Sequence, residues 1–192
     1  MTSPATPRTE EVARIRRVAD QLCTAHATLR DRFASRHNAI DVVVLLLSAW
    51  TASMGFVDPR LTPWLTPFHL DAQLWIGVLG SATFGLALIQ FKTDWRGRSE
   101  AHQRNFSMYS EVKREAGYLL ANLESTTDRD FQRLSDRYDM ASAVGTGIPE
   151  KDFLTLKRRH KLKVAVSRML DENPGSSLWL IKIKLILRDN WK

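Results

Sequence analysis

The sequence predicts an all-α protein: a two-transmembrane helical hairpin with long N- and C-terminal cytosolic helices that form a helical bundle. Three observations predict this fold. Charged side chains are absent from residues 42–57 and 72–91 and are dense on either side of them. Prolines interrupt the chain between these two apolar stretches. In the polar segments, apolar residues recur at intervals of three and four, which is typical of packed helices.

The first element is a predicted cytosolic helix over residues 9–37. Thr9 can act as its N-cap, and Glu10 and Glu11 place negative charge in the first turn, where the helix dipole favours it. The helix carries an apolar stripe with steps of three and four residues: Val12, Ile15, Ala19, Leu22, His26, Leu29 and Phe33.

Two packings are open for this stripe. It can cover other helices of the same chain, or it can form the seam of an intermolecular coiled coil. In the second case the oligomer seam consists of Val12, Ile15, Leu22, Leu29 and Phe33. His26 falls inside the stripe, so we expect a buried, hydrogen-bonded side chain there rather than a pH switch or a ligand.

The two apolar stretches are predicted to span a membrane, with residues 39–57 as the first span and residues 72–91 as the second. A helix rises about 1.5 Å per residue and the hydrocarbon core is about 30 Å thick, so a span needs about 20 residues. The second stretch has this length without a charge. The first has 16 charge-free residues and requires Ile40 and Asp41 to lie near the interface. The alternative is that both stretches are buried helices of a soluble bundle.

An external turn is predicted over residues 58–71, because Pro59, Pro63 and Pro67 prevent a continuous helix. Basic residues flank the two spans: Arg30, Arg32 and Arg36 before the first, and Lys92, Arg96, Arg98 and Arg104 after the second. Arg60 is the only basic residue in the turn. By the positive-inside rule, the chain is a two-pass protein of the inner (cell) membrane with both termini cytoplasmic. The aromatic residues expected at the outer interface are Trp64, Phe68 and Trp75.

Small and polar residues are ordered within the spans. Gly77, Ser81 and Gly85 recur every four positions and predict a ridge for close helix packing. One face of the first span is more polar than a lipid-facing stripe should be, and its candidate pore-lining residues are Asp41, Ser48, Thr51 and Gly55. The alternative is that the hydroxyl groups bond back to their own helix.

Residues 96–192 are predicted to form a cytosolic helical part, with Ser99 as the cap of its first helix, and residues 1–192 to form a single domain. From Pro149 to the C-terminus the chain has eleven Lys and Arg against five Asp and Glu. The densest basic surface consists of Lys157, Arg158, Arg159, Lys161 and Lys163. A solvated helix face, anionic lipid headgroups and an anionic cytosolic ligand are alternative interpretations. The last helix, over residues 178–191, has the composition of a helix that can lie on a membrane interface.

The sequence does not predict an enzyme. The five histidines are scattered and pair with no nearby cysteine or carboxylate at the spacing of metal ligands. Gly145 and Gly147 do not form a nucleotide-binding fingerprint, because no strand is predicted before them. We therefore expect no catalytic residue, no cofactor and no metal site. Cys23 is the only cysteine, so no internal disulfide can form.

The chain resembles the SLATT domain family, the SMODS- and SLOG-associating two-transmembrane effector domains of bacterial antiviral defence systems. The resemblance rests on the order of features along nearly all of the chain. A basic cytosolic helix precedes a short two-span hairpin with a proline-rich turn. The stretch Glu100-Ala101-His102 follows, with Tyr109 seven residues beyond His102, and then the basic tail from Ile148 to Arg168.

This resemblance implies a membrane effector that forms a pore or disrupts the membrane when infection is sensed, arresting or killing the infected cell. The implied partners are membrane lipid, further copies of the same chain, and a separately encoded sensor or nucleotide-synthesising defence protein. A nucleotide or nucleic acid is a further candidate signal. Two alternatives stay open: a membrane anchor or scaffold that recruits a cytosolic partner, and a membrane-tethered nucleic-acid binder that uses the basic C-terminal region.

Overall fold

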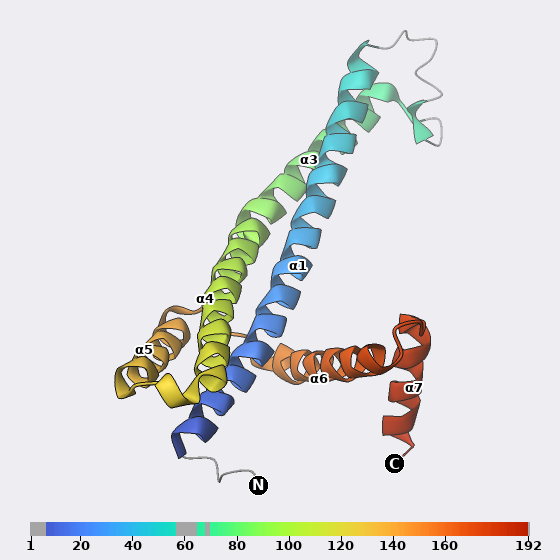
Figure 1. Cartoon of the computed structure of the whole chain (residues 1–192). Coiled ribbons are helices and arrows are strands. Elements are labelled where there is room, and N and C mark those ends of the chain that lie inside the picture. Colours follow the sequence, from blue (N-terminus) through green and yellow to red (C-terminus); the bar gives the residue numbers. More distant parts are fainter. Residues whose placement is uncertain (1–6, 57–64, 68–69, 192) are drawn as a thin grey trace. The chain divides into compact units, whose positions relative to one another are not determined.

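The structure is a computed structural model that describes residues 7–56, 65–67 and 70–191. The described residues are helical and contain no strand, which confirms the all-α class. Six helices and one short 3-10 turn follow in chain order in the described residues: α1 (Pro7–Phe56), α3 (Ala72–Thr93), α4 (Trp95–Ala121), η2 (Leu123–Ser125), α5 (Asp128–Val144), α6 (Glu150–Glu172) and α7 (Leu178–Asn190) (Figure 1). The chain divides into two compact units, one of residues 1–29 and 101–192, the other of residues 30–100.

Helix α1 continues through the boundary that the sequence suggested between residues 37 and 39. No proline interrupts it after Pro7, and Pro7 occupies its first position, where a missing N–H costs nothing. The expected cytosolic helix and the expected first span are therefore parts of one helix. Val57 and most of the predicted external turn, including Pro59, Arg60 and Pro63, lie outside the described residues.

A single residue, Asp94, separates α3 from α4. Its backbone is left-handed, with φ of 41°, and its N–H donates to the Gln90 carbonyl at the end of α3. Its carboxylate accepts from the Gly97 N–H at 3.0 Å in the first turn of α4. A Cβ on Gly97 would lie 2.8 Å from the Asp94 Cγ, so a side chain at this position would displace the capping carboxylate. Asp94 therefore caps α4, while the cap predicted from the sequence, Ser99, instead donates to the Arg30 carbonyl at 3.1 Å.

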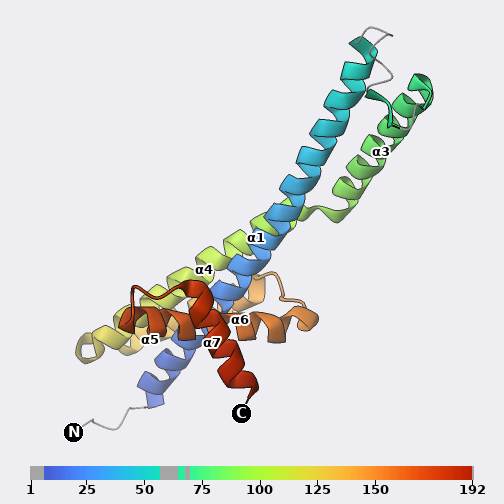
Figure 2. The ribbon, with the colours of Figure 1, turned by 90° about the vertical axis from the view of Figure 1, so that its right-hand side faces the viewer.

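The core of the unit formed by residues 1–29 and 101–192 lies between α1, α4 and α5. The buried residues are Val12, Ile15, Ala19 and Cys23 of α1; Tyr109, Val112, Ala116 and Leu119 of α4; and Leu134 and Ala141 of α5. Figures 1 and 2 show the N-terminal part of α1 alongside α4. Helices with apolar faces at these spacings pack by interdigitating side chains.

This core corrects the predicted oligomer seam. Val12, Ile15 and Leu29 are at most 3% exposed, and Leu22 packs against the same cluster. The stripe of α1 is therefore covered by the chain itself, which is the first of the two packings considered, and we no longer place an oligomer contact on it. Phe33 belongs to the other unit and is half-buried there.

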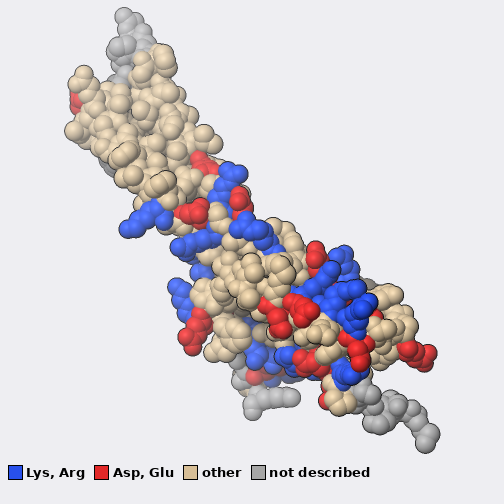
Figure 3. All heavy atoms as spheres, turned by 90° about the vertical axis from the view of Figure 1, so that its left-hand side faces the viewer, with Lys and Arg blue, Asp and Glu red and all other residues tan. Residues whose placement is uncertain are grey.

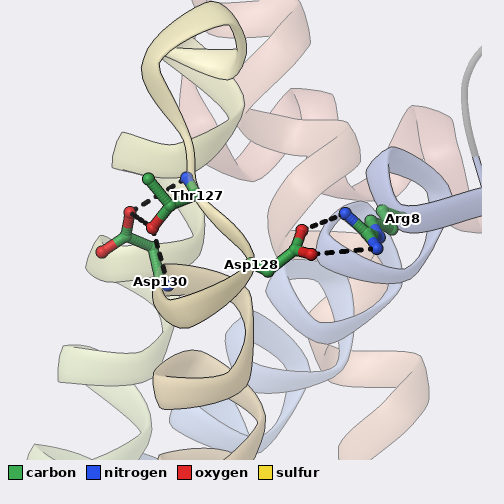
Figure 4. A network of polar contacts seen from close by, with 4 residues as sticks. All are labelled: Arg8, Thr127, Asp128 and Asp130. Atoms are coloured by element: carbon green, nitrogen blue, oxygen red, sulfur yellow. Dashed lines mark hydrogen bonds and ion pairs between the residues drawn. The ribbon is translucent and has the colours of Figure 1, made fainter.

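The N-terminus of α5 is fixed by the polar network in Figure 4. Thr127 and Asp130 form a capping box, in which the Thr127 hydroxyl accepts from the Asp130 N–H and the Asp130 carboxylate accepts from the Thr127 N–H. The Thr127 hydroxyl also donates to the Asp130 carboxylate at 2.6 Å, and this bond, with the one from the Thr127 N–H, holds the pKa of Asp130 below its usual value. Arg8 forms an ion pair with Asp128 across the same region, joining the start of α1 to the start of α5.

Helices α6 and α7 form a second, smaller core. Val166 of α6 packs with Ile181 and Leu185 of α7, and Leu162 and Met169 cover them from the α6 side. α6 also meets α1, because His160 Nδ1 lies 3.0 Å from the Thr24 hydroxyl.

Candidate functional site

The two apolar stretches expose their side chains. In α1 and in the helical segment that begins with α3, only 6% of the most apolar 18-residue stretch is buried within the structure, and both are long and apolar enough to cross a membrane. Leu45 is 67% exposed, Phe84 65% and Phe91 89%. On the face shown in Figure 3, the tan surface of these stretches is almost free of charged side chains. A large uncharged apolar surface is typical of contact with lipid or with another apolar partner.

A polar cluster of three residues joins the two apolar stretches near one end: His37 and Asp41 of α1 and Gln90 of α3. The Gln90 amide donates to Asp41 Oδ1 at 2.5 Å, and His37 Nε2 lies 3.2 Å from Asp41 Oδ2. The Gln90 amide also lies 3.4 Å from His37 Nδ1. A neutral His37 with its proton on Nε2 satisfies all three contacts, since Nε2–H donates to the carboxylate and Nδ1 accepts from the amide.

The cluster changes the role expected of Asp41. Both of its oxygens are engaged inside the chain: Oδ1 joins α1 to Gln90 of α3, and Oδ2 contacts His37 of the same helix. A carboxylate at the edge of an apolar stretch is costly unless it has such partners or faces water. The structure thus supplies the partners for Asp41 that the sequence left unnamed, and in this conformation Asp41 is turned towards α3.

A mainly apolar groove of about 580 Å³ that also contains three hydroxyl side chains lies between α1 and α3. It is lined by Ser48, Thr51 and Ala52 of α1 and by Gly80, Thr83, Phe84 and Ala87 of α3. Two of the candidate pore-lining residues, Ser48 and Thr51, therefore share this groove. The hydroxyls of Thr51 and Thr83 donate to the carbonyls of Leu47 and Leu79 in their own helices, at 2.9 and 2.8 Å. Gly55 is exposed in the last turn of α1 and does not line the groove.

The predicted packing ridge of Gly77, Ser81 and Gly85 makes no close contact with the rest of the described hairpin. Gly77 and Ser81 are exposed, Gly85 is half-buried, and no described atom outside their own helical turn lies within 4 Å of a Cβ added at either glycine. The ridge is therefore open on the surface of α3, and a role in helix packing stays a prediction about contacts with another molecule.

Two aromatic residues pack together at the end of the hairpin opposite to the cluster of His37, Asp41 and Gln90. The rings of Trp50 and Trp75 meet edge to face with centroids 5.7 Å apart, and Trp50 Nε1 donates to the Leu65 carbonyl at 3.2 Å. Trp75 is one of the residues expected at the outer interface; the other two, Trp64 and Phe68, lie outside the described residues.

A buried histidine pair lies in the other unit. His26 of α1 and His102 of α4 are 2% and 3% exposed, and their Nδ1 atoms are 2.9 Å apart. Tyr109 stacks on His26 with ring centroids 5.6 Å apart. One Nδ1 must carry a proton and donate the hydrogen bond, and the other must be unprotonated and accept it, so the accepting ring is neutral. Burial and the charge of His102 lower the pKa of His26 to about 4, and burial also lowers the pKa of His102.

Sequence reasoning anticipated only half of this pair. The burial and hydrogen bonding expected for His26 are confirmed, but its partner was not identified. The available signal was that His102 and Tyr109 lie seven residues apart on the apolar face of the following helix, which brings both to the same side.

The basic surface predicted on residues 157–163 is exposed on α6. Lys157, Arg158 and Lys161 line a groove of about 530 Å³ between α6 and α7, whereas Arg159 and Lys163 do not line it. The apolar and acidic lining residues are Leu154, Leu162, Ala165, Leu185, Ile186 and Asp189.

In the described residues, no group of three or more His, Cys, Asp or Glu side chains could hold a metal ion. Comparison with protein-family models, with curated proteins and with solved structures gave no match. The structure therefore defines a class only: an all-helical protein with two helices that are long and apolar enough to cross a membrane.

Proposed function

We propose that this chain is a two-pass protein of the inner (cell) membrane with both termini in the cytoplasm, and that it acts as a membrane effector whose copies assemble to form a pore or disrupt the bilayer. The observation that carries the proposal is the exposure of the apolar stretches, of which only 6% is buried. In water, such a surface would be covered by the chain itself; in a bilayer, lipid covers it.

The topology follows from the charges that flank the spans. Basic residues concentrate on the side of the termini, and this bias orients short loops in the membrane. The hairpin then places the cluster of His37, Asp41 and Gln90 at the cytoplasmic end and the Trp50–Trp75 pair at the outer end, where indole rings prefer to lie.

Assembly is supported by two surfaces of the hairpin that are open among the described residues. The ridge of Gly77, Ser81 and Gly85 is open, and the groove containing Ser48, Thr51 and Thr83 is lined by small and hydroxyl side chains together with the ring of Phe84. Helices associate in membranes through such surfaces. Two helices cannot enclose water, so conduction requires several copies around one axis.

The signal is proposed to come from a separately encoded sensor or nucleotide-synthesising protein, as the resemblance to SLATT domains implies. The contact between Asp41 and Gln90 is the one that this activation step would break. A ring of Asp41 carboxylates at the cytoplasmic mouth would favour cations, and forming it requires Asp41 to leave Gln90. The resting hairpin described above is then the closed form.

The deciding experiment measures membrane potential in cells that express the chain with its activating partner. We expect depolarisation by the native chain and a reduced effect for Gly77→Ile combined with Gly85→Ile, because bulk on the ridge weakens assembly. Ala82→Ile, which adds apolar bulk at an exposed position off the ridge, is the matched control. Arrested growth without any depolarisation would replace the pore with the scaffold alternative.

The second candidate, a membrane-tethered nucleic-acid binder, is favoured by one observation, the exposed basic groove of α6. Binding of this kind weakens steeply with salt because counterions are released. Oligonucleotide binding by the reconstituted chain, measured at rising salt concentration, separates this function from the effector function.

A further inference from the structure

The groove between α6 and α7 has one continuous wall on α6. Its lining residues form two neighbouring rows along that helix, each with steps of four residues, so they share one face. The rows are Leu154, Arg158 and Leu162, and Lys157, Lys161 and Ala165. The opposite wall consists of Leu185, Ile186 and Asp189 of α7. The α6 wall covers about three helical turns.

The groove is positively charged. Lys157, Arg158 and Lys161 are exposed and, within the part of the chain that the structure describes, form no ion pair. The single acidic residue of the groove, Asp189, is paired with Arg188 at 3.1 Å, so it does not offset them. An acidic partner would therefore meet three available cations along one helix face.

Apolar side chains lie in the same groove as these cations. Leu154 is 73% exposed and Ile186 is 38% exposed, and they belong to opposite walls. Leu162 is half-buried where α6 packs on α7, and it also lines the groove. The groove thus offers apolar contact and positive charge together, which is the complement of a surface that is both apolar and acidic.

We propose that this groove is the docking site for an acidic amphipathic helix of a separate protein. The apolar edge of the incoming helix would lie between Leu154 and Ile186. Its acidic side chains would pair with Lys157, Arg158 and Lys161. The inference rests on the proposed function for what docking does, since it names the contact through which the separately encoded partner delivers its signal.

The dimensions of the groove suit one edge of a helix. Its volume of about 530 Å³ holds a few side chains but not a whole helix. Recognition of a helix by a groove depends on anchors at intervals of three, four and seven residues, a length that the α6 wall covers. The acidic flanks of such a helix would stay at the rim, where the three cations are exposed.

Other occupants fit the groove less well. None of its lining residues is aromatic, so the bases of a nucleic acid would have no ring to stack on. Two copies of the groove would bring like charges together. Among the residues outside the described ranges, Asp58 has the only acidic side chain, so none of those segments has the complementary charge.

The test uses the full chain in phosphatidylcholine nanodiscs and a fluorescein-labelled model peptide of about four helical turns. The peptide carries leucines at intervals of three and four residues on one face and glutamates on both flanks, and a covalent cross-link on its polar face keeps it helical. Two control peptides have the same composition in an order without an apolar face, or lysine in place of glutamate. In fluorescence anisotropy, we expect the acidic amphipathic peptide to bind roughly tenfold more tightly than either control, with an affinity that falls as salt is added.

A groove variant tests the cations directly: Lys157→Gln combined with Arg158→Gln and Lys161→Gln. An exposed ion pair changes an affinity by roughly two- to threefold, so the three together should weaken peptide binding by roughly tenfold. The matched control removes three exposed charges that do not line the groove: Arg129→Gln, Arg159→Gln and Lys163→Gln. Its affinity should stay within roughly twofold of the native value, because distant charges are screened.

The apolar contact is tested by Leu154→Ser. This position is exposed in the free chain, so the fold should tolerate the change, and peptide binding should weaken by roughly fivefold because apolar contact area is lost. Met140→Ser, at an exposed position of α5 outside the groove, should leave the affinity unchanged.

Equal affinity for the amphipathic and the reordered peptide, or equal binding by the native chain and the groove variant, would overturn the inference. Three other results would give the groove a different occupant: single-stranded DNA that binds where the peptide does not, peptide binding only in discs with one copy, or peptide binding lost when phosphatidylglycerol is added. They would assign it to nucleic acid, to a second copy and to lipid headgroups, respectively. A chain that is not retained by the discs would refute the membrane insertion, which is a separate result from an inserted chain that binds no peptide.

Discussion

Mild acid should destabilise the packing of α1 against α4, because it protonates a histidine pair that the fold holds neutral. The pKa of His26 falls from its ordinary value of 6.5 to about 4 on folding. Between these two pH values, His26 is therefore protonated in the unfolded chain but not in the folded chain. The contribution of neutral His26 to stability is therefore fully present above pH 6.5 and is lost as the pH falls towards 4. The pKa of His102 is also lowered, so its contribution has the same sign.

The magnitude follows from the two pKa values of His26. One pKa unit corresponds to about 1.4 kcal/mol, so going from about pH 7 to about pH 5 should lower the free energy of opening by about 2 kcal/mol, or roughly 30-fold in the population of the open state. Asp130, whose pKa is lowered, loses its stabilising contribution only in more acidic solution, so this window reports on the histidines.

The assay is hydrogen exchange of the full chain in nanodiscs, read from peptides of α1 and α4 and corrected for the intrinsic pH dependence of exchange. The comparison variant is His26→Leu combined with His102→Leu, which removes both titrating groups and leaves no unpaired ring nitrogen. It should show a flat profile over this pH range. An equal slope in the native chain and the double variant, or no slope in either, would refute the reasoning.

Three further predictions concern the hairpin and the turn at Asp94 that follows it. Reporters at both termini should be found in the cytoplasm, and a tag within residues 60–68 should react only from outside; a terminus found outside would contradict the charge argument. Gln90→Leu should lower the stability of the hairpin by roughly 1–2 kcal/mol in thermal unfolding in nanodiscs, because it leaves Asp41 without its amide donor, and no loss would mean that the bond is unimportant. Gly97→Ala should cost about 1 kcal/mol by displacing the carboxylate that caps α4, whereas Gly147→Ala, in open space, should be neutral; equal effects would exclude the cap as the cause.

The helical class and the apolar stretches could be predicted because they depend on sums over many residues. Absence of charge over residues 72–91 needs no knowledge of packing to be interpreted. The continuity of α1 was harder to foresee. The charge boundary before residue 42 suggested a break, but charge marks the environment of a helix and not its end, and no proline or glycine lies between Pro7 and Gly55 to stop the hydrogen bonding.

The pairwise contacts of the site could not be derived from local patterns. Asp41 and Gln90 are 49 residues apart, and their contact depends on the register of two antiparallel helices. The register was partly available, since Asp41 lies near the start of the first stretch and Gln90 near the end of the second. The left-handed turn at Asp94 has only a weak signal in the sequence. This signal is an aspartate three residues before a glycine, a spacing that also occurs in many ordinary loops.

The one-residue joint at Asp94 makes the two connections of the hairpin mechanically unequal. α1 is one helix from Pro7 to Phe56, so its backbone hydrogen bonds continue past Ser48 and Thr51. The connection from α3 to α4 is interrupted at Asp94, where the helical hydrogen bonds of α3 end and those of α4 begin. Within the hairpin, helical hydrogen bonding is therefore continuous through the first stretch but ends directly after the second, so a bend between α3 and α4 at Asp94 leaves the helical bonds of the first stretch intact.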